Sequence, residues 1–297
     1  MRKINIIQYN CGNANNKKAR PFLDSLDPKE YPVIALQEPA TTTRTPNFTY
    51  SPRNYRYSRE VHYGIKVLFL IHDKIPLTDW KVVEATDFVE WLQINTGDRD
   101  KPLNIVNVYN PPGRADEPRL SRWKQIKPIL EATASGRTLV VGDFNAHHPE
   151  WAGVAIEREP KADHLLTRMA GLDFQLLNEP GATTWSRGQS DAVLDLGFAS
   201  QDLAPWIMAY KPREEWALIQ DHFPIEIRID INIPDPRKGK RYALQKADWK
   251  AIIDCVHPSL WRDQNPHIAA TKLQTAVRRA LDEHCPKTQP SDRARPE

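Results

Sequence analysis

The sequence has only three cysteines among its 297 residues, Cys11, Cys255 and Cys285. They are too few and too widely spaced for a disulfide framework or a cysteine-rich zinc motif. No apolar run approaches the roughly 20 residues of a membrane-spanning helix. The run that follows Arg2 and Lys3 stops at Ile7, short of the roughly 7–15 apolar residues of a secretory signal. We therefore expect a soluble protein of a reducing, intracellular compartment.

The sequence also lacks a strong excess of charge of either sign, with 41 Lys and Arg against 38 Asp and Glu. Residues 231–297 hold 13 basic and 8 acidic residues, a net charge of +5, and residues 1–230 hold 28 and 30, a net charge of −2. Composition alone therefore gives no reason to expect a nucleic-acid partner for the main part of the chain. Its surplus of carboxylates is compatible with a metal site.

Short apolar runs rich in β-branched residues recur through the first 230 residues and predict strands. These runs cover residues 4–10, 32–37, 66–72, 88–95, 103–109, 138–144, 192–198 and 223–229. Apolar residues at helical spacing lie within 120–130 and 165–172 and predict two helices. Pro128 should bend the first helix or displace its start. Strands mixed with intervening helices predict an α/β or α+β sandwich.

The composition changes near residue 231. The run IPDPRKGKR at 233–241 is typical of a linker, and helical spacing returns at 249–256 and 273–281. Two helices are too few for an independent core. We predict one large domain over 1–230, a linker over 231–242 and a helical extension over 243–297.

The segment GDFNAHHPEW (142–151) directly follows a buried strand. Asp143 and Asn145 would face the same side if the extended backbone continued, which suits the binding of a water or a phosphate oxygen. A simple turn before Pro149 is the alternative. His147 and His148 suggest a metal site, but one structural and one solvated histidine is the simpler interpretation.

Further polar residues lie at the ends of other predicted strands. In QDHFPI (220–225), Asp221 could orient His222, or the pair could merely cap the strand. Glu38 ends the strand of ALQEPA, where a carboxylate suits Mg²⁺, although a surface turn set by Pro39 is also possible.

Three more polar residues, Asn10, Tyr109 and Asp195, end or interrupt apolar runs. Asp195 lies inside VLDLGF, and a buried carboxylate needs a partner. Taken together, polar residues at the ends of many strands predict an active site at one edge of a β-sandwich.

Six ordered segments resemble the endonuclease/exonuclease/phosphatase superfamily, and most closely the apurinic-type endonuclease domain of non-LTR retrotransposons. They are QYNCG (8–12), LQEP (36–39), NVYNPP (107–112), GDFNAHHPEW (142–151), SDAVLDLGF (190–198) and QDHFPI (220–225). The resemblance covers about residues 1–230. Residues 233–253 also resemble the segment that joins that domain to a reverse transcriptase, but no polymerase motif follows, so the reverse-transcriptase region is expected to be absent from this chain.

The resemblance implies a four-layered α/β sandwich of two packed mixed sheets, followed by a short helical extension. It also implies a nuclear hydrolase that uses Mg²⁺ or Mn²⁺, most simply an endonuclease that nicks DNA as in target-primed retrotransposition. Two alternatives stay open: a phosphatase or phosphodiesterase acting on lipid or nucleotide phosphates, and an inactive relic. Neither a membrane nor an obligate protein partner is indicated.

The resemblance also implies roles for individual residues. Glu38 would be the principal metal ligand, with Asn10 beside it and Asp221 as a further candidate ligand. Asp143 and Asn145 would position and activate the attacking water.

On the phosphate side, His222 oriented by Asp195 would hydrogen-bond the scissile phosphate, and Tyr109 would contact the phosphate or support the leaving oxygen. The family often has Ser where this chain has Gln220. The residues expected to meet the substrate are Thr184, Arg187 and His147.

Overall fold

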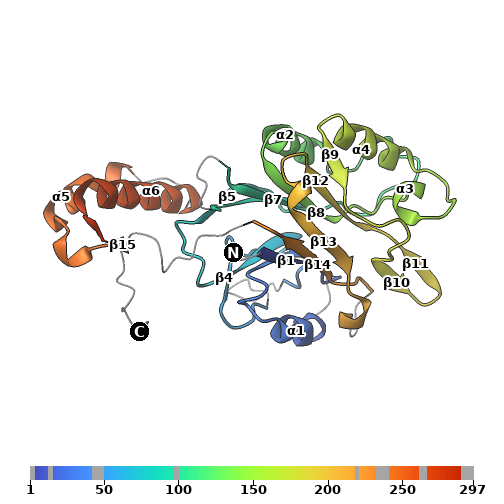
Figure 1. Cartoon of the computed structure of the whole chain (residues 1–297), viewed down its shortest axis with the longest axis horizontal. Coiled ribbons are helices and arrows are strands. Elements are labelled where there is room, and N and C mark those ends of the chain that lie inside the picture. Colours follow the sequence, from blue (N-terminus) through green and yellow to red (C-terminus); the bar gives the residue numbers. More distant parts are fainter. Residues whose placement is uncertain are drawn as a thin grey trace. The chain divides into compact units, whose positions relative to one another are not determined.

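The computed structural model describes residues 4–12, 16–41, 50–96, 101–217, 221–231, 241–260 and 266–288 (Figure 1). The chain divides into two compact units, Met1–Ile233 and Pro234–Glu297. Gln220 and residues 232–240 of the predicted linker lie outside the described residues.

The first unit contains a six-stranded sheet in the order β13-β14-β1-β2-β4-β3. Its strands β1 and β2 are parallel, and the other neighbours are antiparallel. The strands are β1 (Ile4–Asn10), β2 (Val33–Gln37), β3 (Tyr55–Tyr57), β4 (Val67–His72), β13 (Ile207–Pro212) and β14 (Ile225–Ile229).

A second six-stranded sheet has the order β5-β6-β7-β8-β12-β9, with β7 and β8 as its parallel pair. Its strands are β5 (Trp80–Ala85), β6 (Val89–Ile94), β7 (Leu103–Tyr109), β8 (Arg137–Asp143), β9 (Phe174–Leu176) and β12 (Asp195–Ser200). A separate hairpin joins β10 (Trp185–Arg187) to β11 (Ser190–Ala192).

The two sheets pack face to face, and helices cover their outer sides (Figure 1). The main core joins residues of the first sheet, such as Ile6 and Phe69, to residues of the second, such as Ile105 and Leu139. Helix α1 (Asn16–Ser25) packs on the outer face of the first sheet. Helices α2 (Trp123–Thr133) and α4 (Pro160–Ala170) pack on the outer face of the second. The predicted four-layered sandwich of two mixed sheets is therefore confirmed.

Burial on both faces explains the continuous apolar character of the central strands. All seven residues of β7 are buried, because Ile105 faces the other sheet while its neighbour Val106 faces the helices. Strands covered on both sides need apolar residues at every position rather than alternation. The short helix α3 (Pro149–Ala152) and the 3₁₀ helices η1 (Ala204–Trp206) and η2 (Glu214–Trp216) complete this unit.

The second unit has a small core that contains the buried residues Ile252, Ala280 and Cys285. Its elements are β15 (Arg241–Tyr242), η3 (Leu244–Lys246), α5 (Trp249–Cys255), η4 (Pro258–Leu260), α6 (Pro266–His284) and β16 (Lys287–Thr288). Strands β15 and β16 pair antiparallel. None of the helices in the described part of the chain combines the length and apolar character that a membrane span requires.

Candidate active site

The parallel pair in each sheet brings polar residues to the carboxyl ends of its strands. Asn10 at the end of β1 lies opposite Gln37, and Tyr109 at the end of β7 lies opposite Asp143. The amide of Asn10 donates a hydrogen bond to Asp143 Oδ2 across 2.9 Å, which links the two sheets. The edge that the strand-end pattern predicted thus gathers residues from both sheets.

Asp143 is buried and held in a fixed orientation. Its Oδ2 accepts from Asn10, and its Oδ1 accepts from the backbone N–H of Asn145 at 3.0 Å. Burial raises the pKa of Asp143 to about 8, and the charge of Asp195 adds to this, while the charge of His222 acts in the opposite direction. Such a carboxyl group takes up a proton far more readily than an exposed aspartate does.

Asn145 lies in a turn rather than on an extended strand. Strand β8 ends at Asp143, and Asn145 has a left-handed φ of 46°. Its side-chain amide donates to the backbone carbonyl of Asn110 at 2.9 Å. The expectation that the backbone stays extended and aligns the Asp143 and Asn145 side chains is therefore wrong. The short polar side chain of Asn145 stabilises a turn at this point instead.

His222 and Asp195 form a close pair. His222 Nδ1 lies 2.7 Å from Asp195 Oδ2, and His222 Nε2 lies 4.0 Å from Asp143 Oδ2. Burial alone would lower the pKa of His222, but the Asp195 carboxylate, through its charge and its hydrogen bond, raises it to about 9. The imidazole therefore carries a positive charge near neutral pH, with Nε2 directed toward the Asp143 side of the site.

Asp195 is held from its other side by a residue that sequence reasoning missed. Gln8 donates from Nε2 to Asp195 Oδ1 at 3.0 Å, and the Tyr210 hydroxyl donates to Gln8 Oε1 at 3.2 Å. Gln8 is 1% exposed. The available signal was its place two residues before Asn10 on one strand, which puts both amides on the same face.

Glu38 follows β2 with a left-handed φ of 45°. Its Oε1 lies 3.1 Å from Lys66 Nζ, an ion pair that sequence reasoning also missed, and its side chain is 18% exposed. Burial raises the pKa of Cys11 to about 12, with the charge of Glu38 adding to it. Burial likewise raises the pKa of Tyr109 above its usual value, and Glu38 and then Asp143 add to this, so its phenol stays protonated.

The residues around Glu38 suit a hard divalent cation. The donors are oxygens, the Glu38 carboxylate and, one strand away, the Asn10 amide, and Mg²⁺ commonly binds through one or two carboxylates while keeping several waters. The Lys66 ammonium already places positive charge against this carboxylate. The oxygen donors fit the expected ion, which would compete with Lys66 for the Glu38 carboxylate.

Asp221 lies apart from these donors in its observed contacts. It is exposed, and its carboxylate faces Arg187 at 3.8 Å. Among the described residues, neither Asp221 nor Glu38 belongs to a group of three ligand atoms from His, Cys, Asp or Glu close enough to share one ion. The structure thus pairs Asp221 with the β10–β11 hairpin.

The remaining residues expected to meet the substrate divide into two kinds. Arg187 and His147 are exposed. Thr184 is fully buried, and its hydroxyl accepts from the backbone N–H groups of Leu194 and Asp195 at 2.9 and 3.0 Å. The expectation that Thr184 meets the substrate is corrected, because the hydroxyl is used to fix the start of β12.

The two adjacent histidines match the simpler interpretation, in which one is structural and the other is solvated. His148 is buried, caps α3 by accepting from Glu150 N–H at 3.0 Å, and contacts Asp163 at 2.9 Å. The side chain of His147 is exposed. The first is structural and the second is solvated.

Comparison with known proteins agrees with the fold. The family described as endonuclease-reverse transcriptase matches residues 103–226. The endonuclease domain of TRAS1, a telomere-specific non-LTR retrotransposon, is similar in structure, with a TM-score of 0.60, 20% identity, and coverage of 77% of this chain and 99% of that one. No protein with a curated description matches the chain.

Two further solved structures are similar. The AP endonuclease LMAP from Leishmania major has a TM-score of 0.61 and 13% identity, covering 77% of this chain and 88% of that one. The 3′ phosphatase NExo from Neisseria, bound to a product DNA hairpin, has a TM-score of 0.54 and 14% identity, covering 76% and 99%. These likenesses establish the fold, and the resemblance inferred from the six ordered segments is confirmed.

Proposed function

We propose that the chain is a divalent-metal-dependent phosphodiester hydrolase and that it nicks DNA. The observation that carries this proposal is the pairing of His222 with Asp195 and of Asp143 with Asn10, across the two sheets and at the strand edge that holds Glu38. A protonated imidazole, an oriented carboxyl group and a hard-cation ligand are the groups that hydrolysis of a phosphodiester needs.

His222 would act on the phosphate. With Nδ1 held by Asp195, the protonated Nε2 is free to donate a hydrogen bond to a non-bridging phosphate oxygen as negative charge develops there. Asp195 is a positioning residue in this scheme, since it sets the orientation and charge of His222 without touching the substrate.

Asp143 would act on the attacking water. The hydrogen bonds from Asn10 and Asn145 fix both of its oxygens, and a pKa raised to about 8 makes the ionised carboxylate a competent proton acceptor. As the water oxygen bonds to phosphorus, its proton passes to Asp143. Asn145 supports this geometry through its backbone N–H.

Glu38, with Asn10, would hold the divalent cation, which when bound supplies positive charge to the phosphate and the leaving oxygen. Tyr109 keeps its phenolic proton because burial and the Glu38 charge raise its pKa. Its hydroxyl can therefore donate a hydrogen bond to the phosphate or the leaving oxygen. Asp221 stays a secondary candidate for the ion.

DNA is the proposed substrate. The exposed Arg187 and His147 are the residues proposed to meet its backbone, and contacts of this kind position a duplex without reading its sequence. The nuclear location and the role in target-primed retrotransposition stay predictions that depend on this substrate.

The test is a supercoiled-plasmid assay with the full chain. We expect nicking with Mg²⁺ or Mn²⁺, no nicking with EDTA, and loss of nicking in Glu38→Ala. Absence of nicking by the wild-type chain in Mg²⁺ and Mn²⁺, with release of phosphate from a 3′-phosphorylated oligonucleotide, a nucleotide or a phosphoinositide, would instead identify a phosphatase.

The matched control is Glu84→Ala, because Glu84 is an exposed carboxylate on β5. It should nick like the wild type. Equal nicking by wild type and Glu38→Ala would refute the proposed ligand, and inactivity toward every phosphate ester would identify a relic.

A further inference from the structure

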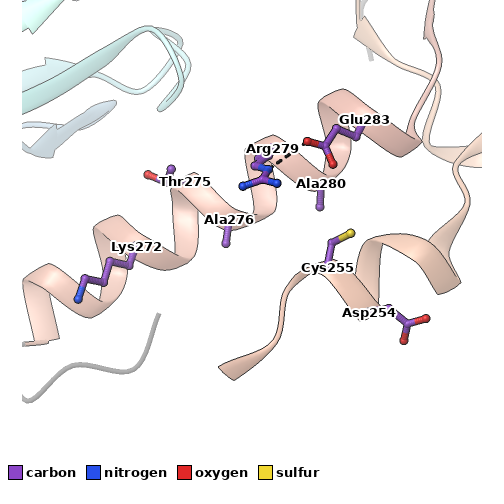
Figure 2. Close-up of a pocket in the computed structure, with 8 residues that line it drawn as sticks. All are labelled: Asp254, Cys255, Lys272, Thr275, Ala276, Arg279, Ala280 and Glu283. Carbon is purple, nitrogen blue, oxygen red and sulfur yellow. Dashed lines mark hydrogen bonds and ion pairs between the residues drawn. The ribbon is translucent and has the colours of Figure 1, made fainter. Parts of the chain in front are cut away.

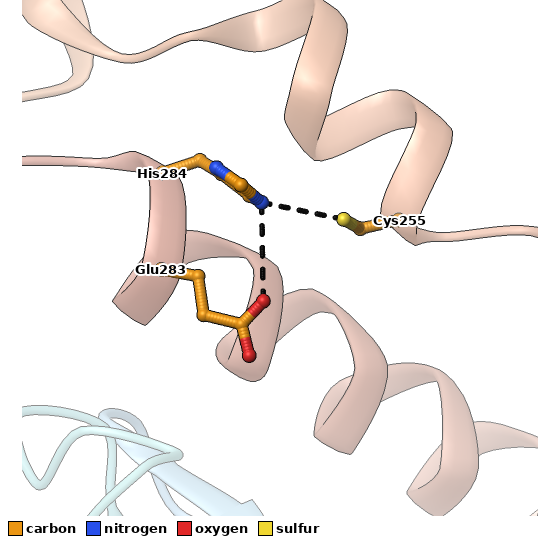
Figure 3. Close-up of side chains that lie close together, drawn as sticks. All are labelled: Cys255, Glu283 and His284. Carbon is orange, nitrogen blue, oxygen red and sulfur yellow. Dashed lines mark hydrogen bonds and ion pairs between the residues drawn. The ribbon is translucent and has the colours of Figure 1, made fainter.

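The second unit brings the carboxyl ends of its two helices together. Cys255 is the last residue of α5, and Glu283 and His284 are the last two residues of α6. Figure 3 shows dashed lines from His284 Nε2 to the Cys255 sulfur and to the Glu283 carboxylate. A thiol, an imidazole and a carboxylate thus converge from two segments about 30 residues apart.

The distances match one face of a tetrahedral zinc site. Cys255 Sγ lies 3.4 Å from His284 Nε2, and His284 Nε2 lies 3.8 Å from Glu283 Oε2. One ligand atom from each of the three residues lies within 4.8 Å of the other two. Typical zinc bond lengths place sulfur about 3.6 Å from nitrogen, and nitrogen about 3.4 Å from oxygen. The two measured distances differ from these values by only a few tenths of an ångström.

The Glu283 carboxylate is already oriented for this role. Arg279, one turn earlier on α6, donates from Nε to Glu283 Oε1 at 3.0 Å, as the dashed line in Figure 2 shows. The other oxygen, Oε2, is the one that faces His284. Outer contacts of this kind commonly hold ligand carboxylates in metal sites.

The surroundings also favour a bound cation. The carboxyl end of a helix carries partial negative charge, and here the ends of α5 and α6 converge on the same point. Glu283 and His284 line an open cavity of about 510 Å³, and Cys255 and Glu283 line a separate one of about 530 Å³, so an ion can reach the cluster and a water can fill its fourth position.

A bound ion would stabilise the second unit, because its core is small. Ile252, Ala280 and Cys285 are the buried residues of its cluster among those described. Cores of this size commonly need a metal or a disulfide to hold a fold together. An ion at the meeting point would tie α5 to α6.

We propose that Cys255, Glu283 and His284 bind one Zn²⁺ ion, with water as the fourth ligand, and that this ion stabilises the packing of α5 on α6. The alternative is a thiol–imidazole hydrogen bond beside an ordinary Arg279–Glu283 ion pair, with no ion. The site lies in the second unit, and its argument does not depend on the nuclease proposal.

The experiment is a Co²⁺ and Zn²⁺ titration of the full chain carrying Glu38→Ala, which removes the carboxylate proposed for the other metal. The metal-free protein should bind one equivalent of Co²⁺, show the thiolate-to-cobalt charge-transfer band, and lose this band when Zn²⁺ displaces Co²⁺. Zinc should also raise the melting temperature of the second unit's transition.

Two variants in this host test the ligands, and two matched variants serve as controls. Cys255→Ser should abolish the charge-transfer band, and His284→Gln should weaken zinc binding more than about tenfold. Cys11→Ser removes a buried thiol of the first unit, and His257→Gln removes an exposed histidine of the second. Both should bind like the host.

The contrary results are equally definite. A cobalt spectrum without a thiolate band, a band that survives Cys255→Ser, or zinc binding that His284→Gln leaves unchanged would overturn the proposal. Far-UV circular dichroism of each metal-free variant shows whether the helices persist. If a ligand variant has lost helix before metal is added, Glu283→Gln replaces it and should weaken zinc binding to the same extent.

Discussion

His222 Nδ1 lies 2.7 Å from Asp195 Oδ2, in a pair that joins the loop before β14 to the first residue of β12 in the other sheet. Gln8, from the first sheet, holds the second oxygen of the same carboxylate. Asp195 is thus fixed from two directions, and it raises the pKa of His222 against the opposing effect of burial. The arrangement predicts which of activity and stability falls when His222 or Gln8 is replaced.

Replacing His222 with glutamine should lower kcat for plasmid nicking by about 10²–10³-fold, the usual cost of removing one donor to a developing oxyanion. His62→Gln is the matched control, since His62 is a half-exposed histidine paired with Asp87 at 2.7 Å. It should keep wild-type kcat. A His222→Gln chain as fast as the control would refute the assigned role.

Replacing Gln8 with leucine should affect both stability and turnover. The change removes the donor to Asp195 Oδ1 and the acceptor for the Tyr210 hydroxyl, both buried, and such losses cost about 1–3 kcal/mol of unfolding free energy. Urea denaturation measures this cost. Because Gln8 acts through Asp195 and His222, kcat should fall while KM changes little.

The control for this change is Gln175→Leu, at an exposed position on β9. It should leave both measurements near wild type. If Gln8→Leu lowers stability yet nicks with wild-type kcat, the glutamine is structural only and does not position Asp195.

The central strands could be predicted from sequence because burial on both faces requires continuous apolar runs. The run at 103–109 matches β7 residue for residue, and the run at 4–10 matches β1. The strand-end pattern also led to Asn10 and Asp143, and Asp195 was found because a carboxylate inside an apolar run needs a buried partner. These signals are local and strong.

Features that depend on distant partners could not be predicted in this way. The edge strands β9 and β10 have three residues each, too short for a periodic pattern. The run at 192–198 divides between β11 and β12, because Thr184 accepts hydrogen bonds from the two backbone N–H groups at the break. The ion pair of Lys66 with Glu38 joins residues 28 positions apart.

Replacing Gly142 with alanine should damage both fold and activity. Gly142 has a φ of 152°, and a Cβ at this position would lie 1.9 Å from the backbone oxygen of Val108 on the neighbouring strand β7. To avoid this clash, β7 and β8 must separate, which costs about 1–3 kcal/mol or more of unfolding free energy. The separation also moves the adjacent Asp143. Denaturation midpoints and nicking rates measure the two effects.

Gly171→Ala is the comparison for this change, because that glycine ends α4 with an ordinary φ of −67° and a nearest Cβ contact of 3.3 Å. It should cost much less stability and no activity. Equal stability of the two variants would show that the strands accommodate the added methyl group.

Glu90 should make the stability of the first unit depend on pH. It is fully buried on β6, and burial raises its pKa from 4.5 to about 7 despite the charge of Arg59 and a hydrogen bond from Ser58. Between these two pH values the folded chain holds a proton that the unfolded chain has lost. The unfolding free energy should therefore fall as pH rises through this range, by on the order of 3 kcal/mol.

A Glu90→Gln variant lacks this titration, so its stability relative to wild type should rise from about pH 4.5 to about pH 8 in urea denaturation. Glu84→Gln, which changes an exposed carboxylate on β5, should instead follow the wild-type profile, and a Glu90→Gln profile parallel to both would contradict the prediction.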